Sequence, residues 1–206
     1  MVVGLTGGIA TGKTTVAGIL KELGAAIINA DEIAREVVQP GSPVLEEVVR
    51  AFGPGYLDRE GSLDRRKLGQ RVFGDPEALE KLNSIVHPYL RMEICRRIEQ
   101  IGGESPLQPI VLEAAVLFEM GADSLVDLVL VTHCSREVQL ARLLEGGRMT
   151  QAEAEQRINS QMAGEEFVRR ADALVDTGGS PAETTRQVEA LWRQCIGERQ
   201  EEGAEP

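Results

Sequence analysis

Residues 7–15, Gly-Gly-Ile-Ala-Thr-Gly-Lys-Thr-Thr, have the types and spacing of a phosphate-binding loop. They fit the pattern G-x-x-x-x-G-K-S/T, in which glycines bring backbone amides close to phosphate oxygens. Lys13 can reach the β- and γ-phosphates of a nucleotide, and the hydroxyl of Thr14 can ligate Mg²⁺. The residues expected to bind a nucleoside triphosphate are Gly7, Gly8, Ile9, Ala10, Thr11, Gly12, Lys13, Thr14 and Thr15.

The segments on either side of this loop have the patterns of a strand and a helix. Residues 1–5, Met-Val-Val-Gly-Leu, form a short apolar run that is typical of a buried strand. From Thr14 to Leu23 the apolar residues recur at helical spacing. A phosphate-binding loop requires this setting, because the helix N-terminus adds partial positive charge. The context argues against a glycine-rich turn that fits the pattern by accident.

A second candidate site follows the strand predicted over residues 25–28. Asp31 then stands at the carboxyl end of a parallel strand, where open α/β sheets bind their ligands. Its carboxylate can accept a proton from a nucleophilic hydroxyl, or it can merely cap the helix predicted over 32–38. Arg35 lies one turn further on the same face. It can hold a substrate phosphate or pair with exposed acids.

Two more side chains are candidates for chemistry. Glu113 ends the buried strand predicted over 110–112 and can hold Mg²⁺ directly or through water, unless it is another helix cap. His87 precedes Pro88 at a predicted helix break, where a structural and a catalytic role are both open.

Composition restricts the class of protein. The chain has 206 residues, enough for one domain with an inserted lobe, and its 42% hydrophobic content is typical of a soluble globular protein. A net charge of −11 argues against a general binder of nucleic acid or anionic membranes. Three distant cysteines, no signal peptide and no long apolar stretch predict a cytoplasmic protein.

The order of the predicted elements indicates an α/β fold, a five-stranded parallel sheet flanked by helices. Residues 1–40 and 104–206 form the predicted core, and 41–103 form a predicted helical insert, of the kind that commonly closes over a substrate. Residues 145–170 are predicted to form a lid that begins at a glycine hinge, although their pattern also fits a surface helical hairpin. The acidic tail, 198–206, is predicted to be disordered. The insert is locally basic, with side chains typical of a solvated face: Arg65, Arg66, Arg71, Arg91, Arg96 and Arg97.

Together these residues resemble the dephospho-coenzyme A kinase family. The opening Gly4-Leu5-Thr6-Gly7-Gly8-Ile9 is more specific than the bare loop pattern. The resemblance covers nearly the whole chain, from Val2 to about Arg193. Further matching segments are Ala30-Asp31 with Arg35, His87-Pro88, Val116-Leu117-Phe118-Glu119, Gln139, Arg142, Arg157, Gln161 and Ala171-Asp172.

The resemblance implies a P-loop kinase that transfers the γ-phosphoryl group of ATP to the ribose 3′-hydroxyl of dephospho-CoA, the last step of coenzyme A synthesis. It implies that Asp31 is the general base, that Lys13 stabilises the phosphates and that Arg142 contacts them from the lid. Thr14 and Glu113 would hold Mg²⁺, and Arg35 and His87 would serve the acceptor. The expected ligands are ATP, Mg²⁺ and dephospho-CoA. No nucleic-acid or membrane partner is expected, and the protein is expected to be a monomer.

Several residues depart from the family pattern. Glu113 stands where the family has a shorter Asp, and Gly146 stands where the lid usually has an Arg that Arg148 would have to replace. The other departures are Asn29 for Asp, Phe167 for Lys and Thr177 for Asn.

Three alternatives remain at this point. Another P-loop kinase, acting on a nucleoside monophosphate or a sugar, would not generally share both Thr6-Gly7-Gly8-Ile9 and His87-Pro88. A GTPase-type switch or motor ATPase would be supported by Asn-Lys-x-Asp, but no Asn in this sequence is followed by Lys. A pseudoenzyme is suggested by the altered lid, whereas intact Lys13, Thr14 and Asp31 argue against it.

Overall fold

The computed structural model describes residues 1–72, 74–145, 147 and 149–202. The chain divides into two compact units, which are described separately below. One unit comprises Met1–Ile28 and Ile101–Pro206, and the other comprises Asn29–Gln100.

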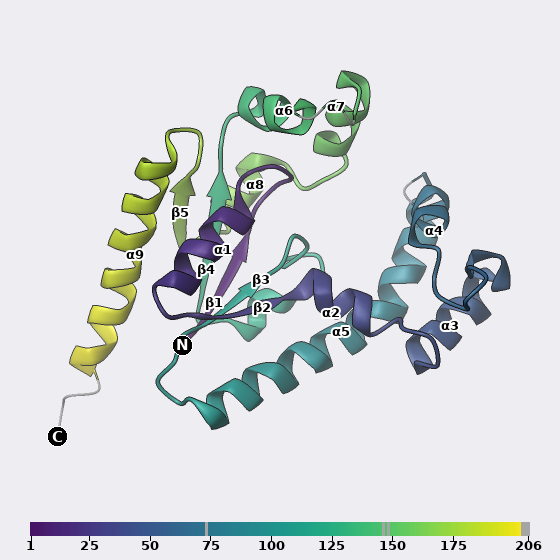
Figure 1. The fold of residues 1–206 in the computed structure, drawn as a ribbon, viewed down its shortest axis with the longest axis horizontal. Coiled ribbons are helices and arrows are strands. Elements are labelled where there is room, and N and C mark those ends of the chain that lie inside the picture. Colours follow the sequence, from purple (N-terminus) through teal and green to yellow (C-terminus); the bar gives the residue numbers. More distant parts are fainter. Residues whose placement is uncertain (73, 146, 148, 203–206) are drawn as a thin grey trace. The chain divides into compact units, whose positions relative to one another are not determined.

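The first unit is built on a five-stranded sheet with the order β2-β3-β1-β4-β5 (Figure 1). Strand β1 pairs in parallel with β3 and with β4, and β4 pairs in parallel with β5. The predicted five-stranded parallel sheet is therefore confirmed. The strands are β1 (Val2–Thr6), β2 (Ala26–Asn29), β3 (Ile110–Glu113), β4 (Leu128–His133) and β5 (Ala173–Asp176).

The central position of β1 follows from its sequence. Leu5 is fully buried, as are Val111 and Val131 on the two neighbouring strands, because a strand covered on both faces needs apolar residues throughout. The register pairs Leu5 with Glu113 and Thr6 with Val131. The carboxyl end of β1 thus lies between the carboxyl ends of β3 and β4, which is where the predicted phosphate loop begins.

Two helices pack over a common core with this sheet, α1 (Lys13–Glu22) and α9 (Pro181–Glu202). Val16 and Leu20 of α1 meet Val188 and Trp192 of α9 in this core. Residues 198–202 of the tail that was predicted to be disordered continue helix α9, and 203–206 lie outside the described residues.

The remaining helices of this unit are α6 (Arg136–Leu144), α7 (Gln151–Asn159) and α8 (Gly164–Arg169). Ser135 caps α6, and Thr150 forms a capping box with Glu153 at α7. Helix α8 was not predicted, because six residues with a single buried side chain, Phe167, are too few to show a helical period. None of the helices in the described ranges is long and apolar enough to cross a membrane.

The second unit is helical. It contains α2 (Ala30–Glu36), α3 (Pro43–Phe52), α4 (Arg65–Val72) and most of α5 (Pro76–Glu104), together with a 3₁₀ turn at Pro54–Tyr56. Its core is formed by residues from three of these helices. The buried members are Val48, Leu68, Val72 and Ala78.

One local prediction in this unit is wrong, and one open alternative is excluded. Helix α5 continues through His87-Pro88 instead of breaking there. The cost of a proline inside a helix is offset here because Leu90 and Ile94, on the following turns, are buried. Asp31 does not cap α2: the side chain of Asn29 does so, accepting hydrogen bonds from the backbone N–H groups of Asp31 at 2.9 Å and Glu32 at 3.1 Å.

Candidate active site

The loop between β1 and α1 adopts a conformation that depends on glycine. Gly7 has φ 145°, and a Cβ atom there would lie 2.3 Å from the carbonyl oxygen of Thr132. Gly12 has φ 82° and lies directly before α1. These two positions let the backbone curl tightly, so that the loop and the first turn of α1 can direct N–H groups at an anion.

Lys13 folds back over this loop. Its Nζ atom donates hydrogen bonds to the carbonyl oxygens of Gly7 and Gly8, both at 2.8 Å. The ammonium group is therefore held at the concave side of the loop by two short contacts. A positive charge at this place is suited to phosphate oxygens.

Thr14 and Glu113 form a pair of oxygen ligands beside Lys13. The Thr14 hydroxyl donates to Oε1 of Glu113 at 3.3 Å, and Glu113 is 9% exposed at the end of β3. The longer side chain of Glu113 therefore reaches the hydroxyl that a Mg²⁺ ion would use. Mg²⁺ prefers oxygen ligands and commonly takes only one or two from the protein, so this pair fits it. In the described part of the chain no group of three His, Cys, Asp or Glu side chains could hold a metal.

Buried threonines support the loop from below. The hydroxyl of Thr11 lies 2.8 Å from that of Thr132 and donates to the carbonyl of Gly8 at 2.8 Å. Thr132 also donates to the carbonyl of Thr6 at 3.3 Å, which connects β4 to the end of β1. Sequence reasoning missed Thr132. Its position at the carboxyl end of a predicted strand was the available signal, because ligand-site residues of parallel sheets gather there.

Arg142 of α6 also contacts the loop. Its guanidinium donates to the carbonyl of Ala10 at 3.0 Å, to the hydroxyl of Thr177 at 3.2 Å and to the Thr177 carbonyl. Together with the loop it lines a cavity of ≈ 430 Å³, which lies within the size range of small-molecule sites. Other residues that line the cavity are Thr15, Gly179, Pro181 and Thr184.

Two glutamines hold the backbone of Ile9. Gln139 of α6 donates to its carbonyl at 2.8 Å, and its N–H donates to Oε1 of Gln161 at 2.6 Å. Gln161 follows α7, so the segment predicted as a lid contacts the loop directly. Of the predicted hinge, Gly146 and Arg148 lie outside the described residues.

The other three predicted site residues belong to the helical unit. Asp31 and Arg35 are exposed and lie one turn apart on α2. His87 is half-buried on α5, and this burial lowers the pKa of its imidazole. The neutral form of His87 is therefore favoured at neutral pH.

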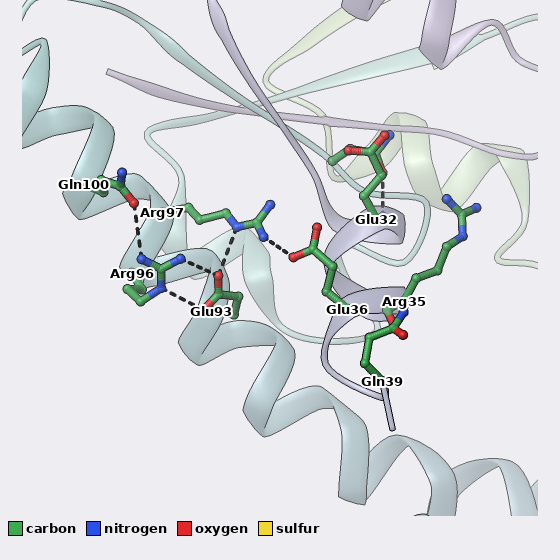
Figure 2. A network of polar contacts seen from close by, with 9 residues as sticks. Glu32, Arg35, Glu36, Gln39, Glu93, Arg96, Arg97 and Gln100 are labelled. Atoms are coloured by element: carbon green, nitrogen blue, oxygen red, sulfur yellow. Dashed lines mark hydrogen bonds and ion pairs between the residues drawn. The ribbon is translucent and has the colours of Figure 1, made fainter. Parts of the chain in front are cut away.

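A network of ion pairs joins α2 to α5 within the helical unit (Figure 2). Arg97 pairs with Glu36 of α2 and, through Nε at 3.0 Å, with Glu93 of its own helix. Hydrogen bonds from Arg96 and then from Arg97 lower the pKa of Glu93 to about 2. The network holds α2, the helix that carries Asp31, against α5.

Comparison with known proteins is consistent with this geometry. A sequence profile described as dephospho-CoA kinase matches residues 1–183. The dephospho-CoA kinase of Symbiobacterium thermophilum is 46% identical over 205 residues, which cover 100% of this chain and 84% of that protein. The one from Leifsonia xyli subsp. xyli is 47% identical over 190 residues, covering 92% of this chain and 96% of that protein.

A solved structure has the same fold. The structure of dephospho-CoA kinase from Campylobacter jejuni matches with a TM-score of 0.71 at 27% identity, covering 96% of this chain and 98% of that one. The predicted P-loop fold and the resemblance noted in the sequence are thus confirmed, and other P-loop kinase families are no longer alternatives. The chain belongs to the dephospho-CoA kinase family.

Proposed function

We propose that this protein transfers the γ-phosphoryl group of ATP to the ribose 3′-hydroxyl of dephospho-CoA and so makes coenzyme A. The observation that carries the proposal is the family match over residues 1–183, on a chain whose phosphate loop is complete. The hydroxyl oxygen forms a bond to the γ-phosphorus, the bond from that phosphorus to the β–γ bridging oxygen breaks, and ADP leaves. The hydroxyl proton is accepted by a carboxylate.

The sheet unit binds ATP in this proposal. The loop amides and the ammonium of Lys13 hold the β- and γ-phosphates, as their positions at the loop support. Thr14 and Glu113 hold Mg²⁺, which when bound neutralises charge on the phosphate oxygens. Little covalent work is required of the protein, since phosphoryl transfer depends on positioning and on charge stabilisation.

The cavity beside Arg142 takes the nucleoside part of ATP. Its wall includes Arg142, Thr177 and Pro181 together with residues of the loop. The guanidinium of Arg142 is planar and is fixed by two carbonyl groups, so it can stack on a base or reach phosphate oxygens. Residues 145–170 act as a lid over the phosphates, which the contact of Gln161 with Ile9 supports.

The insert, residues 41–103, covers the acceptor in this proposal, and α2 supplies the base. Asp31 accepts the proton of the 3′-hydroxyl. Asn29 caps α2, so the carboxylate of Asp31 is not needed for capping. Arg35 and His87 contact the acceptor, and the protein acts as a monomer.

The first test measures ADP release from Mg-ATP with and without dephospho-CoA, together with the mass of the product. A product heavier by one phosphate group supports the proposal. The Asp31→Asn substitution is expected to reduce turnover by about 10²–10⁴-fold, the usual contribution of a general base. Glu32→Gln is a matched control, because it removes an acidic charge from the same first turn of α2.

Two results would count against the proposal. Nucleotide binding without dephospho-CoA-dependent turnover would rule out the activity and favour a pseudoenzyme. Turnover that is equal in the Asp31→Asn and Glu32→Gln variants would keep the activity but remove Asp31 from the role of base.

A further inference from the structure

The charged residues of α2 point to two different sides. Glu36 is paired with Arg97 in the network of Figure 2, whereas the side chain of Arg35 extends away from that network. The backbone carbonyl of Arg35 accepts a hydrogen bond from the side chain of Gln39 at 3.2 Å. In the described ranges its guanidinium forms no ion pair. On one side of α2 the charge of Glu36 is thus neutralised by an ion pair, whereas Arg35 lies on another side without one among the described residues.

A second arginine is attached to α2 next to Arg35. Arg65, at the start of α4, donates from Nη2 to the carbonyl oxygen of Ala34 at 2.8 Å. Partial burial, and then the positive charge of Arg35, lower the pKa of the Arg65 guanidinium. Two guanidinium groups are therefore held near one another, and no acidic residue of the described chain pairs with either. Their mutual repulsion would be relieved by an anion.

Asp31 lies on the same side of α2 as Arg35. The two are four residues apart, so their side chains stand one above the other at a spacing of about one helical turn, roughly 5–6 Å. In a nucleotide, the 3′-hydroxyl and the 5′-phosphate are joined through three carbon atoms, C3′, C4′ and C5′. That span is comparable to one helical turn. A carboxylate and a guanidinium at this spacing can contact the two groups of a single nucleotide at once.

We propose that Arg35 and Arg65 bind the 5′-diphosphate of the acceptor, and that this contact holds its 3′-hydroxyl at Asp31. The proposal rests on the proposed function, because it assigns the acceptor's phosphates to that same site. Two guanidinium groups can each form paired hydrogen bonds with phosphate oxygens. The acceptor is then selected as a nucleoside 5′-phosphate ester, and a nucleoside without phosphates binds poorly.

A simpler explanation is that both arginines are ordinary surface residues. The Ala34 carbonyl lies near the C-terminal end of a short helix, where a cation is favourable by itself. Arg66 provides the comparison, since it is the exposed neighbour of Arg65 on α4 and none of the described contacts attaches it to α2. A role in phosphate binding predicts that Arg65 and Arg66 differ toward phosphorylated acceptors but not toward adenosine.

Steady-state kinetics of the Arg35→Met, Arg65→Met and Arg66→Met variants test the proposal. We expect the KM for dephospho-CoA to rise about 10–100-fold in the first two, the usual effect of losing a hydrogen bond to a charged group. The KM for ATP and the kinetics of Arg66→Met should stay within twofold of the parent. Arg35→Lys should fall between the parent and Arg35→Met, because it keeps the charge but loses the paired hydrogen bonds. An unchanged KM for dephospho-CoA in both variants would overturn the proposal.

Calorimetry separates this inference from the proposed function. AMP and adenosine are titrated into the parent and the variants while a non-hydrolysable ATP analogue saturates the nucleotide site. AMP should bind the parent more tightly than adenosine does, and Arg35→Met and Arg65→Met should abolish that difference without changing adenosine binding. Equal binding of AMP and adenosine by the parent would refute the arginine site even if the kinase activity is present. A loss of adenosine binding in the variants would instead indicate damage to the helical unit.

Discussion

The guanidinium of Arg142 is fixed by Thr177, whose hydroxyl accepts from it at 3.2 Å and whose carbonyl accepts from its second nitrogen. The same hydroxyl donates to the carbonyl of Thr11 at 2.8 Å, inside the phosphate loop. One continuous set of hydrogen bonds thus connects Arg142 to Thr177, which follows β5, and Thr177 to the loop. This arrangement depends on the planar shape of a guanidinium, which a lysine lacks.

Replacing Arg142→Lys should weaken ATP binding more than acceptor binding. Lysine keeps the charge, but its single nitrogen replaces the two nitrogens that Arg142 uses, one for the carbonyl of Ala10 and the hydroxyl of Thr177 and the other for the Thr177 carbonyl. We expect the KM for ATP to rise about tenfold while the KM for dephospho-CoA stays constant. Arg136→Lys on the same helix is the control, because Arg136 contacts Asn159 and not the loop. Equal effects of the two substitutions would contradict the assigned role.

Removing the ammonium of Lys13 should abolish most of the turnover. A single stabilising group of this kind is typically worth about 10²–10³-fold in kcat, so the Lys13→Met variant should retain below one hundredth of the parent rate. The circular dichroism spectrum should not change, because the helix propensities of Lys and Met are similar. Lys21→Met, in the last turn of the same helix, should leave the rate unchanged. A Lys13→Met enzyme with near-normal kcat would show that the loop amides suffice.

The pairing of Thr14 with Glu113 predicts a specific dependence on Mg²⁺. Glu113→Gln keeps the size of the side chain but loses its negative charge, so more Mg²⁺ should be required for half-maximal activity. The measurement is a Mg²⁺ titration at fixed free ATP, with Glu22→Gln on the surface of α1 as the control. If the Mg²⁺ requirement is the same in both variants, Glu113 does not contribute to the metal site.

Glu93 makes the stability of the chain sensitive to acid. Because the folded-state pKa of Glu93 is lowered from 4.5 to about 2, its stabilising contribution is complete above pH 4.5 and is lost as the pH falls toward 2. Glu93→Gln should therefore reduce the slope of the unfolding midpoint against pH within this window. Urea unfolding at several pH values, with Glu99→Gln on the same helix for comparison, measures the effect. The same slope in parent and Glu93→Gln would show that the ion pairs in Figure 2 do not persist in solution.

Sequence patterns predicted the sheet, the loop and the helices that follow the first two strands, because these depend on neighbouring residues. The role of Thr132 could not be predicted, because it contacts Thr11 only when two strands that are distant in the sequence lie next to each other. Capping stayed open for Asp31 because Asn and Asp cap helices about equally well, and only the backbone shows that Asn29 takes this place. Packing on both sides kept α5 intact through Pro88, which local rules could not show.

The bonds that hold the phosphate loop have a consequence for the order of events on the ribosome. The loop is among the first segments to be synthesised, yet its supports are Thr132, Gln139, Gln161 and Thr177. A nascent chain shorter than about 180 residues lacks the last of these, and translation proceeds at about 5–20 residues per second. For about 8–32 s the emerging polypeptide thus carries a complete phosphate motif without all of the groups that shape it. The loop can reach the conformation described above only once almost the entire chain has been translated.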